Sequence, residues 1–152
     1  MAHARTISGD IGLFGCSMGA YFGMMAFRDD LISQALFLSP VVDMKRLIEN
    51  MMAWFDITPE RLKQEKEIQT PVKTLYWDYY EYVVGHPVTW DKPTTILYGE
   101  RDELCEFDCV KRFADLAQAD LTVWDEGEHY FHTEVQLAFL QNWLRERIGD
   151  KE

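Results

Sequence analysis

Three side chains in this sequence have the types and spacing needed to cleave an acyl bond. Gly15-Cys16-Ser17-Met18-Gly19 fits the pattern G-x-S-x-G, which is typical of a serine on a sharp turn between a strand and a helix. A serine hydroxyl is a poor nucleophile until a base removes its proton. His129 is the candidate base, and Asp102 is the candidate acid that would orient it.

The serine turn makes specific demands on its neighbours. The hydroxyl must project from a strained backbone, and bulky residues around it would clash, so we expect no room for side chains at Gly15 and Gly19. The backbone N–H of Met18, at the start of the expected helix, can point at a developing oxyanion. A glycine-rich turn with no catalytic role is the alternative interpretation.

The histidine is chosen by its place in the chain. His129 follows the expected strand 121–124, and loops after parallel strands collect on one edge of a sheet, where Ser17 also lies. His132 comes three residues later, beside Thr133, which is expected to cap the last helix. His132 therefore stays open as an alternative base.

Asp102 follows another expected strand, 94–98. A base of this kind needs an acid that fixes its tautomer and stabilises the imidazolium. The alternative interpretation is a solvated loop acid, because Glu100 and Glu103 stand on either side. The location of Asp102 at the carboxyl end of a strand favours the catalytic interpretation.

The elements that must position these residues alternate between strands and helices. This order predicts an α/β fold with a parallel sheet covered on both faces. Thr133 and Gln136 form a capping box before the last helix, and Gly149 ends it. The expected apolar face of that helix is Leu137, Leu140, Leu144 and Ile148. The expected strands are 11–14, 35–38, 94–98 and 121–124, and the expected flanking helices include 18–27 and 107–117.

Residues 41–92 depart from this alternation and predict a helical cap inserted into a single domain, residues 1–152. Asp43 can cap a first cap helix, and Thr58-Pro59 begins a second over 60–68. A third helix is expected over 74–84, which is rich in aromatic residues. These aromatic side chains either line an acyl or aryl pocket or only pack the cap on the core.

Charge and cysteine content exclude several functions. The net charge is −11 with only 15 lysines and arginines, which disfavours nucleic acid and anionic membranes as partners. Three cysteines without a disulfide pattern indicate a reducing, cytoplasmic environment. Cys105 and Cys109 lie one helical turn apart, but no nearby histidine completes a zinc site, so neither a metal nor a cofactor is expected.

Three motifs together resemble the C-terminal half of an α/β-hydrolase with a small helical cap: G-C-S-M-G, I-L-Y-G-E-R-D and G-E-H-Y-F-H. The resemblance covers nearly the whole chain and has the family's order of Ser, Asp and His. It implies a partial α/β-hydrolase fold with about four parallel strands and a carboxylesterase-like serine hydrolase acting on a small ester. Ser17 would be the nucleophile, Asp102 the acid, His129 the base, and Met18 would supply an oxyanion N–H.

Members of the family carry further strands before this turn, and a loop among them supplies a second oxyanion donor. Here the first expected strand begins at Ile11. Residues 11–14 are therefore expected to form an open sheet edge, which favours a homo-oligomer that pairs two such edges antiparallel. The alternative function is a catalytically inactive hydrolase fragment that acts only as an assembly or binding module.

Overall fold

The central element is a parallel sheet, seen in a computed structural model that describes residues 1–149. Four strands lie in the order β1–β2–β5–β6, and each pairs in parallel with its neighbours. This confirms the predicted α/β fold. The strands are β1 (Gly12–Cys16), β2 (Gln34–Leu38), β5 (Thr94–Gly99) and β6 (Asp120–Trp124).

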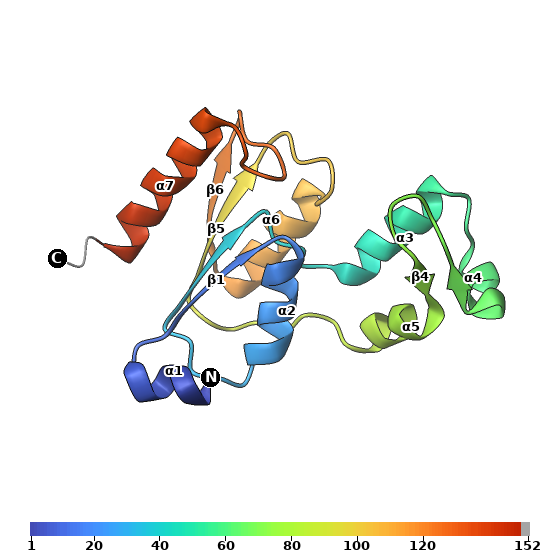
Figure 1. The fold of residues 1–152 in the computed structure, drawn as a ribbon, viewed down its shortest axis with the longest axis horizontal. Coiled ribbons are helices and arrows are strands. Elements are labelled where there is room, and N and C mark those ends of the chain that lie inside the picture. Colours follow the sequence, from blue (N-terminus) through green and yellow to red (C-terminus); the bar gives the residue numbers. More distant parts are fainter. Residues whose placement is uncertain (150–152) are drawn as a thin grey trace.

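Helices cover both faces of this sheet (Figure 1). Alternate residues of a strand point to opposite faces. Phe37 accordingly packs with α2 (Met18–Phe27) and α6 (Phe107–Ala117), while Leu36 and Leu38 pack with α7 (Glu134–Ile148). A short helix before the sheet, α1 (Ala2–Ile7), has no counterpart among the predicted elements.

Helix α7 differs in part from its predicted packing. Leu140 and Leu144 face the sheet as expected, but Trp143 is the most buried apolar residue of the helix. Leu137 is 41% exposed and Ile148 is 57% exposed. The reason is length: 15 residues of helix span about 22 Å, whereas the five residues of β6 span about 17 Å. The ends of α7 therefore extend past the sheet.

The segment between β2 and β5, which we call the cap, forms a lobe beside the sheet (Figure 1). Asp43 and Thr58 cap its first two helices as predicted, accepting from the backbone N–H groups of Arg46 and Arg61. That residues 41–92 are an insertion within one domain stays a prediction. The cap contains α3 (Met44–Trp54), α4 (Pro59–Glu65), β3 (Glu67–Ile68), β4 (Leu75–Tyr76) and α5 (Trp77–Gly85).

The predicted helix ends inside the cap were wrong at two places. Ile68 and Leu75 pair in an antiparallel β3–β4 hairpin, so the helices expected over 60–68 and 74–84 are shorter. Lys66 has a φ of 68°, which ends α4. Both hairpin side chains are buried, so long-range burial overrides the local helical pattern.

No helix among residues 1–149 is long and apolar enough to cross a membrane. The cytoplasmic location expected from the cysteines stays a prediction.

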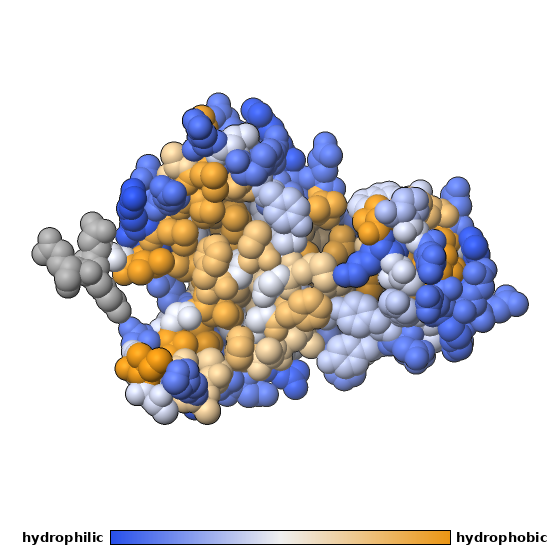
Figure 2. All heavy atoms as spheres, viewed as in Figure 1, coloured by the Kyte–Doolittle hydropathy of each residue, from blue (hydrophilic) through white to orange (hydrophobic). Residues whose placement is uncertain are grey.

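The outer edge of β1 has no neighbouring strand among residues 1–149. On and beside it, Phe14 is 51% exposed and Phe22 is 49% exposed. Figure 2 shows apolar side chains gathered over this face of the molecule, between α7 and α2. An open strand edge with exposed apolar neighbours is a template for pairing with another chain.

The homo-oligomer expected through residues 11–14 can be measured directly. Light scattering at micromolar concentration should give at least the mass of a dimer. Phe14→Lys should shift the chain towards monomer, because charge on an edge strand opposes pairing. Trp54→Lys is the control, since Trp54 is similarly exposed but lies on the cap. A folded wild-type monomer, or dissociation by the Trp54 variant alone, would contradict the prediction.

Candidate active site

Ser17 occupies the turn between β1 and α2 with a strained backbone. Its φ is 52° and its ψ is −123°, a region that non-glycine residues rarely adopt. Backbone hydrogen bonds to three segments hold it there. The Ser17 N–H donates to the Leu38 carbonyl at 3.0 Å, and the Ser17 carbonyl accepts from Ala20 at 3.1 Å and Val41 at 3.2 Å. The strain is therefore maintained by β2, by α2 and by the loop after β2.

The two glycines of the motif have different environments. A Cβ at Gly15 would lie 2.7 Å from the Ala20 Cα and 2.9 Å from its nitrogen, so only glycine fits between the strand and the helix. This confirms the expectation for Gly15. A Cβ at Gly19 would meet nothing within 4 Å, so the same expectation was wrong there. Gly19 lies in the first turn of α2 and faces open space.

The three predicted side chains meet at the carboxyl edge of the sheet. His129 Nε2 lies 2.8 Å from Ser17 Oγ, and His129 Nδ1 lies 2.8 Å from Asp102 Oδ2. Ser17 and His129 are buried, and the Asp102 side chain has no exposed surface. They come from the loops after β1, β5 and β6, three different strands whose carboxyl ends share one edge.

The Asp102 carboxylate is held by further hydrogen bonds. Its Oδ1 accepts from the backbone N–H groups of Leu104 at 2.8 Å and Cys105 at 2.9 Å. A buried carboxylate is costly unless it is hydrogen-bonded, and these two donors together with His129 compensate for its burial. The loop therefore fixes one oxygen and leaves the other for the imidazole.

Two glycines bring the acid loop and the histidine loop together. A Cβ at Gly99 would lie 2.5 Å from the Gly127 carbonyl carbon, and a Cβ at Gly127 would lie 2.7 Å from the Gly99 Cα. The Arg101 N–H also donates to the Gly127 carbonyl at 2.9 Å. This contact was missed from the sequence, although both quoted motifs contain its glycine: Gly99 in I-L-Y-G-E-R-D and Gly127 in G-E-H-Y-F-H.

His132 does not reach Ser17. Its ring nitrogen Nδ1 lies 2.8 Å from the Tyr130 carbonyl and 3.3 Å from a Glu128 carboxylate oxygen, and the side chain is 64% exposed. Thr133 caps α7 as predicted, because its hydroxyl oxygen accepts from the Gln136 N–H. The Gln136 side chain accepts from the backbone N–H of His132 rather than from that of Thr133, so only half of the expected capping box forms. The geometry thus favours His129 over the alternative base.

Met18 is the first residue of α2, directly after Ser17. The first N–H groups of a helix have no carbonyl partner within the helix, and they lie at the positive end of its dipole. The Met18 N–H therefore has the position at the helix start that the sequence predicted. Its role as an oxyanion donor stays a prediction.

One group of residues near the site has metal-ligand chemistry. Ligand atoms of Asp102, Cys105 and His129 all lie within 4.8 Å of one another. Both ring nitrogens of His129 already have hydrogen-bond partners. Burial, and then the charge of Asp102, raise the pKa of the Cys105 thiol to about 12, so it stays protonated at neutral pH. A protonated thiol is a poor metal ligand, and these residues fit a hydrogen-bond network better than a metal site.

Several solved structures with a similar fold are hydrolases or esterases. The chain resembles the mouse alpha/beta hydrolase domain-containing protein 10, with a TM-score of 0.73 at 14% identity, over 93% of this chain and 62% of that one. It resembles the esterase Est1E from Butyrivibrio proteoclasticus, with a TM-score of 0.72 at 19% identity, over 97% and 66%. A putative hydrolase from Agrobacterium vitis gives 0.69 at 17% identity, over 91% and 61%.

These likenesses show that the chain has an α/β-hydrolase fold, as the motifs predicted. The chain spans less than two thirds of the length of the structures it resembles. No family model matches the sequence, and no curated protein sequence matches it.

Gly15 and Gly19 provide a matched test of the packing at the serine turn. Gly15→Ala should destabilise the fold by about 1–3 kcal/mol, because the new methyl group overlaps the Ala20 backbone. Gly19→Ala should be neutral or stabilising by up to about 1 kcal/mol, because alanine suits an open helical position. Urea denaturation measures both changes. Equal stability of the two variants would contradict the packing described for Gly15.

The Gly99–Gly127 contact should hold His129 in position against Ser17, and a side chain at Gly99 should disturb that position. Gly99→Ala should force the two loops apart and slow the reaction of Ser17 with a fluorophosphonate by about 10²-fold, since a displacement near 1 Å can cost that much. Gly85→Ala is the control, because a Cβ at Gly85 meets nothing within 4 Å. Unchanged labelling of a folded Gly99 variant would show that the contact does not position His129.

Proposed function

We propose that this chain is a serine hydrolase of the α/β-hydrolase type that cleaves a small carboxylic ester through an acyl-enzyme on Ser17. The observation that carries the proposal is the continuous hydrogen-bonded series Ser17 Oγ, His129 and Asp102, with both distances at 2.8 Å. Nucleophile, base and orienting acid are the parts that acyl transfer by serine requires. The esterase among the similar structures supports the same class of reaction.

The hydrogen bonds support His129 Nε2 as the nitrogen that acts as the base. A carboxylate oxygen only accepts, so His129 Nδ1 donates its hydrogen to Asp102. The other nitrogen, Nε2, then has a free electron pair facing the Ser17 hydroxyl, which donates to it. This tautomer is the one needed to remove the proton from Ser17 Oγ.

The reaction then proceeds in two halves. His129 Nε2 takes the Ser17 proton while Oγ bonds to the ester carbonyl carbon, and the Met18 N–H stabilises the oxyanion. The C–O bond to the alcohol breaks, and His129 gives its proton to that oxygen. Water, deprotonated by His129, next attacks the acyl carbon. The bond from that carbon to Oγ then breaks, His129 returns the proton to Oγ, and the acid leaves. Asp102 stabilises the imidazolium in both halves.

A fluorophosphonate probe tests the role of Ser17. The wild-type chain should be labelled, and Ser17→Ala should not, because the probe bonds to an activated serine oxygen. Equal labelling of both would remove Ser17 from the mechanism. Absence of labelling in a folded wild-type chain would instead favour the inactive-fragment alternative.

The roles of the two ionisable partners are tested by ester hydrolysis. Asp102→Asn should lower kcat by about 10⁴-fold, because an amide favours the wrong imidazole tautomer. His129→Ala should abolish measurable turnover, whereas His132→Ala is the control and should keep it, since His132 faces Tyr130 and Glu128. A larger loss from His132→Ala than from His129→Ala would overturn the assignment of the base.

A further inference from the structure

An apolar cavity of about 100 Å³ lies between the serine turn and the cap, and we call it the Met18 cavity. Met18 forms one wall, and helix α3 forms another through Met44, Leu47, Ile48 and Met51. Tyr79 of α5 and the residues around β4 close it. Methionine side chains are flexible and polarisable, so this lining can adapt to an apolar group of varied shape.

The backbone connects this cavity to the candidate nucleophile. Met18 follows Ser17 directly, and the Val41 N–H donates to the Ser17 carbonyl at 3.2 Å. Asp43 then caps α3, the helix that supplies one wall of the cavity. The cavity and the serine turn are therefore held in a fixed relation by residues 39–44.

The proton transfers indicate which side of the site binds the alcohol part of the ester and which binds the acyl group. His129 must protonate the departing alcohol oxygen, so the alcohol has to lie on the His129 side. A second cavity, of about 420 Å³, lies there and is lined by His129 together with charged residues such as Arg101, Glu103 and Glu128. It shares no lining residue with the Met18 cavity. The acyl group would therefore lie on the opposite, apolar side, towards the Met18 cavity.

We propose that the Met18 cavity binds the acyl group of the substrate and restricts it to short, apolar chains, an inference that rests on the function proposed above. A dry apolar cavity of about 150 Å³ holds benzene, which has six carbons, so a cavity of about 100 Å³ holds about four. Butyryl and valeryl groups fit this size. Longer chains exceed it.

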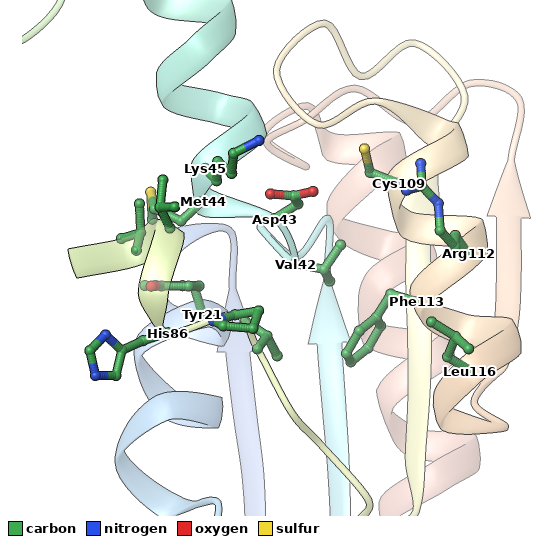
Figure 3. A pocket seen from close by; sticks show the side chains of 14 residues that line it. Tyr21, Val42, Asp43, Met44, Lys45, His86, Cys109, Arg112, Phe113 and Leu116 are labelled. Carbon is green, nitrogen blue, oxygen red and sulfur yellow. The ribbon is translucent and has the colours of Figure 1, made fainter. Parts of the chain in front are cut away.

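A larger cavity, of about 260 Å³, is a rival for the same role (Figure 3). It lies between α2, the start of α3 and α6, and Asp43, Lys45, His86 and Arg112 contribute charged or polar groups to its lining. Ser17 lines neither cavity, but its neighbour Met18 lines only the Met18 cavity. Its chemistry and its place suit an apolar acyl chain less well than the Met18 cavity does.

Hydrolysis of p-nitrophenyl esters from acetate to octanoate measures the preference. Each buried methylene should raise kcat/KM by about fourfold, which corresponds to about 0.8 kcal/mol. Butyrate should therefore exceed acetate by roughly 15-fold, and octanoate should fall below butyrate. A preference that rises steadily through octanoate would overturn the size limit.

Variants at the wall test which cavity is responsible. Leu47→Trp should fill the Met18 cavity and move the optimum to acetate, and Met51→Ala should enlarge it and move the optimum to longer chains. Val84→Trp is the matched control, because Val84 lies on the cap and lines only the rival cavity. If the Val84 variant shifts the optimum and the two wall variants do not, the rival cavity binds the acyl group.

Fluorophosphonate labelling separates this inference from the proposed function. If Ser17 is labelled and esters are cleaved, but the optimum ignores Leu47→Trp and Met51→Ala, only the acyl-group assignment fails. If a folded wild-type chain is neither labelled nor active on any ester, the proposed function itself fails, and the acyl-group assignment falls with it.

Discussion

The close approach of Gly99 and Gly127 is the contact on which the site depends. Only two residues without side chains let the backbones after β5 and β6 lie this near. Asp102 stands three residues beyond the first glycine and His129 two beyond the second, so the distance between their loops fixes the hydrogen bond between them. That bond in turn fixes the ring of His129 against Ser17. A wider separation would leave a buried carboxylate without its third donor, which is costly.

The strained serine turn is the second constraint, and it depends on the sheet. A φ of 52° is unfavourable for serine, and it persists because β2 and the loop after it hold the Ser17 N–H and carbonyl. The same loop leads into α3 and so positions the cap. Ser17, the backbone N–H of Met18 and the wall of the Met18 cavity are therefore linked through one short stretch of backbone.

The cap shows where local patterns cease to decide structure. The starts of its first two helices follow from side-chain caps at Asp43 and Thr58, which act within three residues and can be read directly from the sequence. Its β3–β4 hairpin depends on Ile68 meeting Leu75 and on the burial of both, which no local pattern encodes. The same holds for Trp143, whose burial depends on where α7 crosses the sheet rather than on the helical spacing of leucines.

The sequence by itself determined the alternation of strands and helices and the parallel sheet, and it placed Ser17, Asp102 and His129 after strand ends, because motifs at strand ends are local and parallel strands share one carboxyl edge. It did not distinguish the needs of Gly15 and Gly19, and it left His132 open as a base. Tertiary structure separated Gly15 from Gly19 and brought His129 rather than His132 beside Ser17, because these contacts depend on which atoms of separate segments lie within a few ångströms. The role of His129 as the base stays a proposal.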